Sequence, residues 1–200
     1  MIFAETLWLT RSDLIRAVDC YLHVYNRGVD RQLLFFGEDY YSLFLSLMES
    51  SLIRADLKFI AYCLMPNHFH FLVKQATPFA ISVFMEQVSG EYAKTVNQLR
   101  GRTGHLYQRR YGMKWIWKES DVPVAANYIH QNPPKAGLVK APEDWEHSSC
   151  REYFGLRPPR FLELQEVLSR LNGHQSYRDF LGSLGAADSM LPSQCSFREQ

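Results

Sequence analysis

The sequence predicts an α+β fold in which helices cover one face of an antiparallel sheet. Four segments have the aromatic and β-branched composition of strands, and the longer segments between them repeat apolar residues at helical spacing. Their order is strand, helix, strand, strand, helix, strand, followed by an extra helix. That order matches the split β-α-β plan of ferredoxin-like domains. The 200 residues, of which 46% are apolar, are enough for one such domain with a full core.

The first half of the chain supplies three of the predicted strands and one helix. CYLHVYN (20–26) is rich in aromatic and β-branched residues and stops before Gly28, so we expect the first strand there. The segment EDYYSLFLSLMES after Gly37 has its apolar residues at helical spacing, which predicts the first helix. LKFIAYCLM (57–65) and HFHFLVKQ (68–75) are separated by a short turn, so they should pair as a hairpin.

The second half supplies the longest helix, the last strand and a third helix. An amphipathic pattern from Pro78 to Gly101 predicts the long helix, and YGMKWIWK (111–118) alternates bulky and polar residues as a strand does. The third helix should end near Gln131, because the prolines that follow cannot donate and should push Asn132 out of the helical conformation. Its expected start and stop signals are Ser120, Asp121, Pro123, Pro133 and Pro134.

Composition and charge narrow the class of protein. The formal net charge is only +1, so attraction to nucleic acid must come from local clusters of Lys and Arg. The N-terminus has an acidic residue where a signal peptide needs a basic one, and no apolar run reaches the ~20 residues of a membrane span. The four cysteines are scattered without a CxxC pair, which favours a reducing compartment. We therefore expect a soluble cytoplasmic protein.

Two histidines stand one residue apart in the third predicted strand. Because side chains in a strand alternate between faces, His68 and His70 should point the same way, and both imidazoles could reach one ion. Two ligands do not complete a metal site, so a further residue must join them. The alternative is that both are partly exposed histidines of a sheet. The remaining histidines, His23, His105, His147 and His174, have no ligand spacing and are interpreted as surface or core residues.

The third predicted helix offers the missing groups. Tyr128 and Asn132 are four residues apart and therefore share a helix face, whereas His130 lies on roughly the opposite side. A nucleophile and an oxygen ligand would then be presented together. The alternative is that Tyr128 is a core aromatic and Asn132 a residue that caps the C-terminus of the helix.

A basic segment with interleaved aromatic residues runs from the end of the long helix through the fourth predicted strand. Residues 94–118 contain seven basic residues and no acidic one, together with two tyrosines and two tryptophans. This composition is typical of a groove that follows a phosphate backbone and stacks unpaired bases. A charged, solvated loop is the alternative, but such a loop does not need four large aromatic residues.

Several motifs together resemble a known family. YLHVYNRGVDRQLLFF, YCLMPNHFHFLV, GHLYQRRY, YIHQNPPKAGLV and PEDWEHSSCREYFG follow one another in the order found in the REP-associated tyrosine transposases. These are a branch of the single-tyrosine HUH transposases, which act on single-stranded DNA. The resemblance runs from about Tyr21 to Gly155 and implies a catalytic domain over residues 1–155. Residues 156–200 resemble the family's C-terminal helical extension, with two short helices and a flexible tail.

The resemblance implies roles for the candidate residues. His68 and His70 match the family's histidine pair, Tyr128 matches its nucleophile, and Asn132 stands where relatives place a polar group that completes the metal site. Family members use Mg²⁺ or Mn²⁺ and act on bacterial nucleoid DNA. The chain departs from the common pattern at Pro134-Lys135 and Gln108-Arg109, which bears on DNA-sequence preference more than on chemistry.

The expected reaction is cleavage and rejoining of single-stranded DNA through a 5′-phosphotyrosine, at a hairpin with an adjacent single-stranded guide. Since relatives act as monomers or as dimers, either a monomer or a homodimer is expected. Two alternatives stay open, namely a hairpin-binding module without catalysis and a metal-dependent hydrolase using His68, His70 and His130. The residues expected to hold DNA are Arg27, Arg100, Arg102, Tyr107, Arg109, Arg110, Lys114, Trp115, Trp117 and Lys118.

Overall fold

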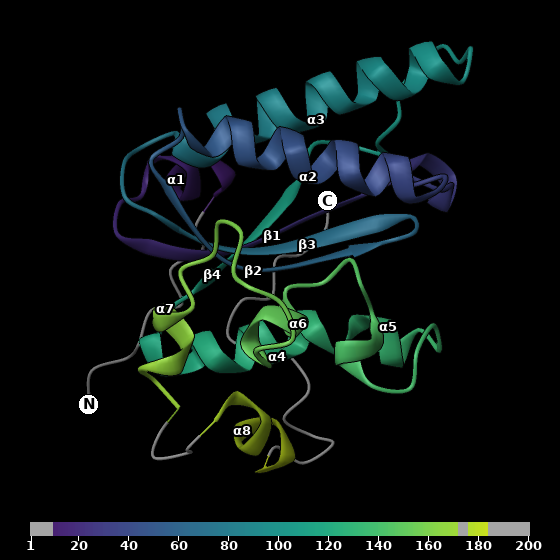
Figure 1. Cartoon of the computed structure of the whole chain (residues 1–200). Coiled ribbons are helices and arrows are strands. Elements are labelled where there is room, and N and C mark those ends of the chain that lie inside the picture. The colour runs from purple at the N-terminus through teal and green to yellow at the C-terminus, as the bar shows by residue number, and fades with distance from the viewer. Residues whose placement is uncertain (1–9, 172–175, 184–200) are drawn as a thin grey trace.

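The centre of the molecule is a four-stranded sheet with the order β2-β3-β1-β4, in which all neighbouring strands are antiparallel (Figure 1). The computed structural model describes residues 10–171 and 176–183 of the chain. This order is that of a ferredoxin-like sheet, so the predicted α+β fold is confirmed, and each strand ends within two residues of its predicted bounds. The strands are β1 (Cys20–Arg27), β2 (Leu57–Met65), β3 (His68–Gln75) and β4 (Gly112–Ile116).

Helices cover both faces of the sheet. Figure 1 shows α2 and α3 above the sheet and α4 to α8 below it. The prediction that helices cover one face was therefore wrong, because the segment after the last strand folds back beneath the sheet. The helices are α1 (Arg11–Arg16), α2 (Glu38–Leu52), α3 (Ala80–Leu99), α4 (Val122–His130), α5 (Asn132–Lys135), α6 (Cys150–Tyr153), α7 (Gln165–Leu168) and α8 (Tyr177–Ser183).

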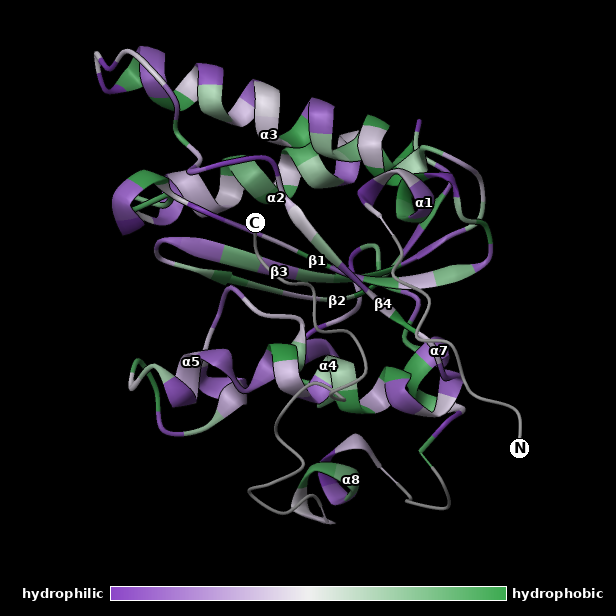
Figure 2. Ribbon diagram, turned by 180° about the vertical axis from the view of Figure 1, so that it is seen from behind, coloured by the Kyte–Doolittle hydropathy of each residue, from purple (hydrophilic) through white to green (hydrophobic). Residues whose placement is uncertain are grey.

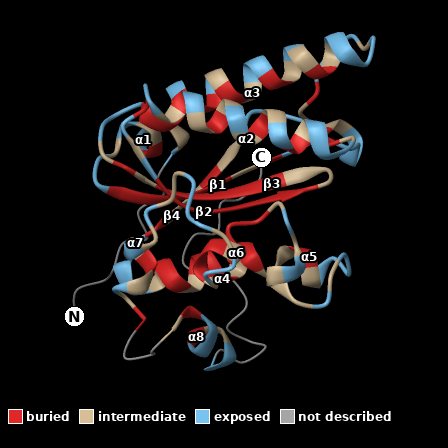
Figure 3. Ribbon diagram, in the orientation of Figure 1, coloured by how far each residue is buried: buried red, intermediate tan, exposed pale blue. Residues whose placement is uncertain are grey.

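Two hydrophobic cores lie on the two faces. Strands β1, β2 and β3 are buried along most of their length, whereas α2 and α3 turn a buried stripe to the sheet and an exposed stripe to solvent (Figure 3). The same two helices alternate between hydrophilic and hydrophobic residues (Figure 2). The first core contains Phe44, Phe69 and Phe84, and the second contains Ile60, Leu72, Ala125, Ile129 and Val167. Alternate residues of each strand therefore face different cores.

The segment around α4 differs from the prediction at both ends. Ser120 and Asp121 lie in a 3₁₀ turn (Glu119–Asp121), and neither side chain caps α4. The two prolines do not stop the helical path, because they occupy the first positions of α5, where their missing N–H groups are tolerated. Asn132 is consequently helical, against the prediction. Its side-chain amide donates to the carbonyl of Ile129, which Pro133 cannot serve.

Helices α1 and α6 were not predicted from the sequence, and some predictions fall outside the described residues. Helix α1 begins with a capping box, in which the backbone N–H of Thr10 donates to the carboxylate of Asp13 and Asp13 N–H donates back to the Thr10 hydroxyl. The predicted flexible tail and His174 lie outside the described residues. Across residues 10–171 and 176–183, every helix is too short or too polar to span a lipid bilayer.

Candidate active site

Strand alternation places a polar cluster on the face of the sheet that α4 covers. His68 and His70 of β3 lie on this side, while Phe69 and Phe71 point into the other core, as the sequence predicted. The pairing register sets Tyr25 of β1 opposite His70. Two further residues of the same face, His23 of β1 and Lys114 of β4, pair with each other. The strand register thus gathers polar side chains of three strands at one place.

His70 is held by a second imidazole. Its Nδ1 lies 2.9 Å from Nε2 of His23, and the two rings stack with their centroids 5.1 Å apart. Both residues are buried, with exposed fractions of 9% for His70 and 2% for His23. When Nδ1 of His70 donates to His23, Nε2 of His70 keeps a lone pair for an ion. His23 therefore acts as an outer support for a candidate ligand.

His68 has a comparable outer partner. Its Nδ1 lies 2.7 Å from the amide oxygen of Asn67, and the amide nitrogen of Asn67 donates to the carbonyl of Arg31. An amide oxygen only accepts, so the hydrogen of His68 is on Nδ1 and its Nε2 is left with a lone pair. The rings of His68 and His70 are nearly perpendicular, with centroids 5.1 Å apart. Nε2 of each imidazole therefore keeps a lone pair that can bind an ion.

The surroundings keep these imidazoles neutral. Burial, and to a smaller extent the charge of Lys114, lowers the pKa of His23 to about 3. Burial also lowers the pKa of His70 well below its usual value, with smaller contributions from its histidine neighbours and Lys114. For His68, burial and then the charge of Arg27 lower the pKa. Neutral imidazole is the form that binds metal ions, so the cluster is in its ligand state at neutral pH.

Tyr128 of α4 lies against this cluster. Its ring meets His23 and His70 edge-on, with centroid distances of 5.7 Å and 6.2 Å. The residue is half-buried, and burial raises the pKa of its phenol. Nζ of Lys135, from α5, stands 5.3 Å from the centroid of the same ring. A phenol, two imidazoles and an ammonium group therefore surround one region of the sheet.

Asn132 follows Tyr128 by one helical turn. Its side-chain amide nitrogen donates to the carbonyls of Tyr128 and Ile129 at 2.9 Å and 3.1 Å, which fixes the side chain. The oxygen Oδ1 is then the atom of this side chain that can bind an ion. In the described part of the chain, no third His, Cys, Asp or Glu joins His68 and His70 as a ligand group. Imidazole nitrogen and amide oxygen are both donor types that a divalent cation accepts, so the chemistry of these side chains fits such an ion.

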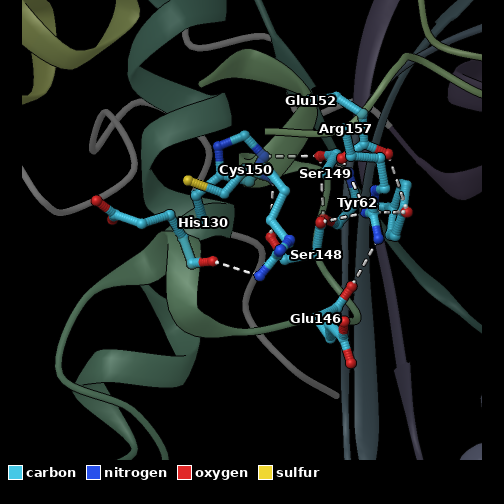
Figure 4. A network of polar contacts seen from close by, with 10 residues as sticks. Tyr62, His130, Glu146, Ser148, Ser149, Cys150, Glu152 and Arg157 are labelled. Atoms are coloured by element: carbon cyan, nitrogen blue, oxygen red, sulfur yellow. Dashed lines mark hydrogen bonds and ion pairs between the residues drawn. The ribbon is translucent and has the colours of Figure 1, made fainter. Parts of the chain in front are cut away.

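His130 points away from the cluster, as its helical phase predicted. It is fully buried, with Nε2 lying 2.7 Å from the hydroxyl of Ser149 and Nδ1 2.8 Å from the hydroxyl of Tyr177. Figure 4 shows His130 reaching from α4 into the network around Ser149 and Arg157. This arrangement removes His130 as a partner of His68 and His70, so the hydrolase alternative lacks its third histidine.

The residues expected to hold DNA occupy several environments. Trp115 and Trp117 stack on each other at 4.5 Å, and Trp117 is 47% exposed. Arg27 is exposed and donates through Nε to the side chain of Gln108 at 2.5 Å. Lys114 faces the histidines, as described above. Four further candidates, Arg100, Arg109, Arg110 and Lys118, are exposed, and Arg102 is half-exposed.

Tyr107 does not fit an exposed stacking platform. Its hydroxyl is buried, and its ring packs edge-on against Phe69 at 6.3 Å. The backbone of Tyr107 forms a β-bridge with that of Gly28, which directly follows β1. The aromatic composition of this segment therefore serves the first core as well as the surface.

Four members of the site were not predicted from the sequence, namely His23, Tyr25, Asn67 and Lys135. Period-two alternation puts His23 and Tyr25 on one face of β1, but only the pairing of β1 with β3 shows that this is the face of His70. Tyr25 also needs Gly112 opposite it, because a Cβ at Gly112 would collide with the Tyr25 ring. The glycine in the sequence YGMKW was thus an available signal.

Comparisons with known proteins find relatives of this chain. The family described as IS200-like transposases matches residues 16–132. A protein of Haemophilus influenzae described as a REP-associated tyrosine transposase is 27% identical over 121 residues, which are 56% of this chain and 69% of that protein. A solved REP-associated tyrosine transposase bound to a REP hairpin is similar with a TM-score of 0.60 at 18% identity, covering 72% of this chain and 85% of the other. That structural likeness shows a shared fold.

Proposed function

The chain belongs to the IS200-like transposase family, and we propose that it is a REP-associated tyrosine transposase that cleaves and rejoins single-stranded DNA at hairpin sequences. The observation that supports this most directly is the position of Tyr128. Its ring lies edge-on to His23 and His70, on the only face of the sheet that presents the histidine pair. The REP hairpin is the ligand of the solved relative, and we extend it to this chain as part of the proposal.

In the proposed reaction, the oxygen of Tyr128 attacks the phosphorus of the scissile phosphodiester. The bond from phosphorus to the 3′-oxygen breaks, the phenol proton leaves to solvent, and the leaving 3′-oxygen takes up a proton from solvent. The product is a 5′-phosphotyrosyl protein with a free 3′-hydroxyl on the departing strand. Because the phosphotyrosine is still a phosphodiester, a second 3′-hydroxyl can attack it and release Tyr128. Cleavage and rejoining are then the forward and reverse directions of the same transesterification.

Positive charge must favour the phenolate, since burial alone raises the pKa of Tyr128. Lys135 beside the ring and Lys114 near the histidines are two cations of the described residues that could do so. A divalent Mg²⁺ or Mn²⁺ held by His68, His70 and Asn132 would polarise the scissile phosphate and support the leaving 3′-oxygen. One chain supplies every one of these groups, which supports activity as a monomer, although a homodimer is compatible with the same site.

Outside the reacting groups, DNA would follow exposed basic and aromatic residues. Arg27 stands at the strand end beside His68, since the two residues pair across β1 and β3. The stacked pair of Trp115 and Trp117 offers an indole face for an unpaired base. We propose that Arg100, Arg102, Arg109, Arg110 and Lys118 add phosphate contacts.

The first test is the formation of a covalent protein–DNA adduct. A single-stranded hairpin oligonucleotide labelled at its 3′-end is incubated with Mn²⁺ and the full chain, and the products are resolved on a denaturing gel. The wild type should retain label, whereas Tyr128→Phe should lose the adduct and keep hairpin binding, because only the attacking oxygen is removed.

Tyr25→Phe is the matched control, because Tyr25 is the other phenol near His70, with a centroid distance of 6.3 Å. It should still form the adduct. Adducts with Tyr128→Phe would show that the nucleophile is assigned wrongly, and their loss with Tyr25→Phe alone would transfer the role to Tyr25. Binding without any adduct in the wild type would favour the module without catalysis.

A further inference from the structure

Arg27 lies at the end of β1, on the same face of the sheet as the histidine pair. It is directly opposite His68 in the antiparallel pairing of β1 with β3, and side chains at opposite positions project from the same face. Burial lowers the pKa of His68, and the charge of Arg27 adds to that effect, so the guanidinium acts on the imidazole from close by. An exposed cation therefore stands beside one of the two candidate ligands.

Residues 106–109 hold Arg27 from the other side. The backbone of Tyr107 forms a β-bridge with that of Gly28, and the N–H of Gln108 donates to the carbonyl of Arg27 at 3.0 Å. This pairing sets Gln108 opposite Arg27 and on its face of the sheet, whereas Tyr107 packs against Phe69 in the first core. Gln108 consequently belongs to the surface of the candidate active site.

The side chain of Gln108 orients the guanidinium of Arg27. Nε of Arg27 donates to Oε1 of Gln108 at 2.5 Å. Within residues 10–171 and 176–183, this guanidinium makes no other hydrogen bond and no ion pair with a carboxylate. The edge formed by Nη1 and Nη2 is therefore left for a ligand. Such an edge offers two parallel N–H groups, which match two oxygens of a phosphate.

We propose that Arg27 is a catalytic residue that binds the phosphodiester at the histidine pair, and that Gln108 is its positioning residue. The proposal deepens the proposed function and rests on it. Negative charge grows on the non-bridging oxygens while Tyr128 attacks phosphorus, and donors fixed toward those oxygens stabilise that state more than the ground state. Because a guanidinium stays protonated, Arg27 transfers no proton in this step. This role goes beyond the general contact with the DNA backbone expected of Arg27.

Gln108 is also one of the positions at which this chain departs from the common family pattern. The departure is expected to bear on DNA-sequence preference, but its contact with Arg27 gives it a part in the chemistry as well. An exposed arginine loses side-chain entropy when it binds a phosphate, and a partner that orders it beforehand reduces that loss. The effect of Gln108 should therefore pass through Arg27.

The first measurement needs neither cleavage nor a metal ion. The full chain, labelled with ¹⁵N, is titrated in EDTA with TpT, in which one phosphodiester joins two thymidines. TpT should shift the Nη signals of Arg27 and the ring signals of His68 with one dissociation constant, and Arg27→Lys identifies the arginine signals by removing them. Gln108→Ala should raise that constant about 2- to 12-fold, the cost of ordering one long side chain.

The second measurement is the rate of adduct formation at saturating hairpin DNA in Mn²⁺. Arg27→Lys keeps the charge but loses the paired N–H groups, so the rate should fall about 100-fold or more, with hairpin affinity changed less than about 3-fold. Gln108→Ala should lower the rate about 10-fold, because the guanidinium is then misplaced. The double variant should be no slower than Arg27→Lys, since Gln108 acts through Arg27. Arg54→Lys, at an exposed arginine that follows α2, is the matched control and should react like the wild type.

Unmoved Arg27 signals in the titration, or a wild-type rate with Arg27→Lys at saturating DNA, would overturn the role of Arg27. If the losses of Gln108→Ala and Arg27→Lys multiply in the double variant, Gln108 is not the positioning residue. A wild type that forms no adduct contradicts the proposed function instead. The titration then decides the role of Arg27 at the histidine pair by itself.

Discussion

At the scale of residues, the site depends on side chains that orient other side chains. His23 and Asn67 each lie within hydrogen-bonding distance of Nδ1 of a candidate ligand, which leaves Nε2 of His70 and of His68 for an ion. The sequence predicted that His68 and His70 share a face, because alternation along one strand is a local property. It did not predict His23 or Tyr25 as partners, since their contribution depends on which strands pair and in which register.

We expect His68→Ala and His70→Ala to abolish DNA cleavage and to weaken Mn²⁺ binding by more than about 10-fold, because each removes a ligand nitrogen. Asn67→Ala should cost about 10- to 100-fold in Mn²⁺ affinity, the usual effect of removing an outer partner. Calorimetric titration with Mn²⁺ measures both. His105→Ala, which changes an exposed histidine on the opposite face, should bind Mn²⁺ like the wild type. Unchanged cleavage by either ligand variant would contradict the metal site.

At the scale of elements, the junction of α4 and α5 positions the nucleophile. The helical phase of Tyr128, His130 and Asn132 was predictable from spacing, and the structure places His130 opposite Tyr128 in a buried network. The behaviour of the two prolines was not predictable from local rules. The side chain of Asn132 supplies the donor that Pro133 lacks, and the helical path continues into α5.

Two substitutions of Asn132 separate its structural role from its ligand role. Asn132→Asp keeps an oxygen but loses both donors, so unfolding free energy should fall by about 1–2 kcal/mol while Mn²⁺ binding is retained. Asn132→Ala should show the same loss of stability and also weaken Mn²⁺ binding. Urea denaturation and Mn²⁺ titration distinguish the two. If Asn132→Ala binds Mn²⁺ as tightly as Asn132→Asp, the amide oxygen is not a ligand.

At the scale of the whole molecule, the sheet separates the face covered by α2 and α3 from the face that carries the candidate active site. The aromatic residues of α2 and α3 fill the first core, and α4 joins α7 and α8 in the second. The division into residues 1–155 and 156–200 stays a prediction. The second core takes Val167, Leu171, Tyr177 and Phe180 from the extension, so burying them should stabilise the helix that presents Tyr128. The sequence predicted these helices, but their docking under the sheet depends on contacts distant in the chain.

Buried neutral histidines should make the stability of the molecule depend on pH. The pKa of His130 is about 3 in the folded chain because of burial, whereas the unfolded value is about 6.5. Below pH 6.5 the unfolded chain therefore binds a proton that the folded chain does not, and stability falls as pH falls. For His130 the expected slope is about 1.4 kcal/mol per pH unit well below pH 6.5, and His23 behaves alike.

Urea denaturation in EDTA between pH 5 and 7 measures this slope. His130→Gln should flatten the dependence, since glutamine can bond Ser149 and Tyr177 without titrating. Equal slopes in wild type and variant would contradict the assignment of His130 as a buried neutral group.

The central claim is that Tyr128, placed against the histidine pair, becomes linked to the 5′-phosphate of cleaved DNA. The most direct measurement is mass spectrometry of the peptide that remains attached to a short oligonucleotide after cleavage in Mn²⁺ and digestion of the protein. We expect a peptide containing Tyr128, linked through its phenol oxygen to a 5′-phosphate. Linkage at another residue, linkage through a 3′-phosphate, or a cleaved strand with a free 5′-phosphate and no attached peptide would contradict it.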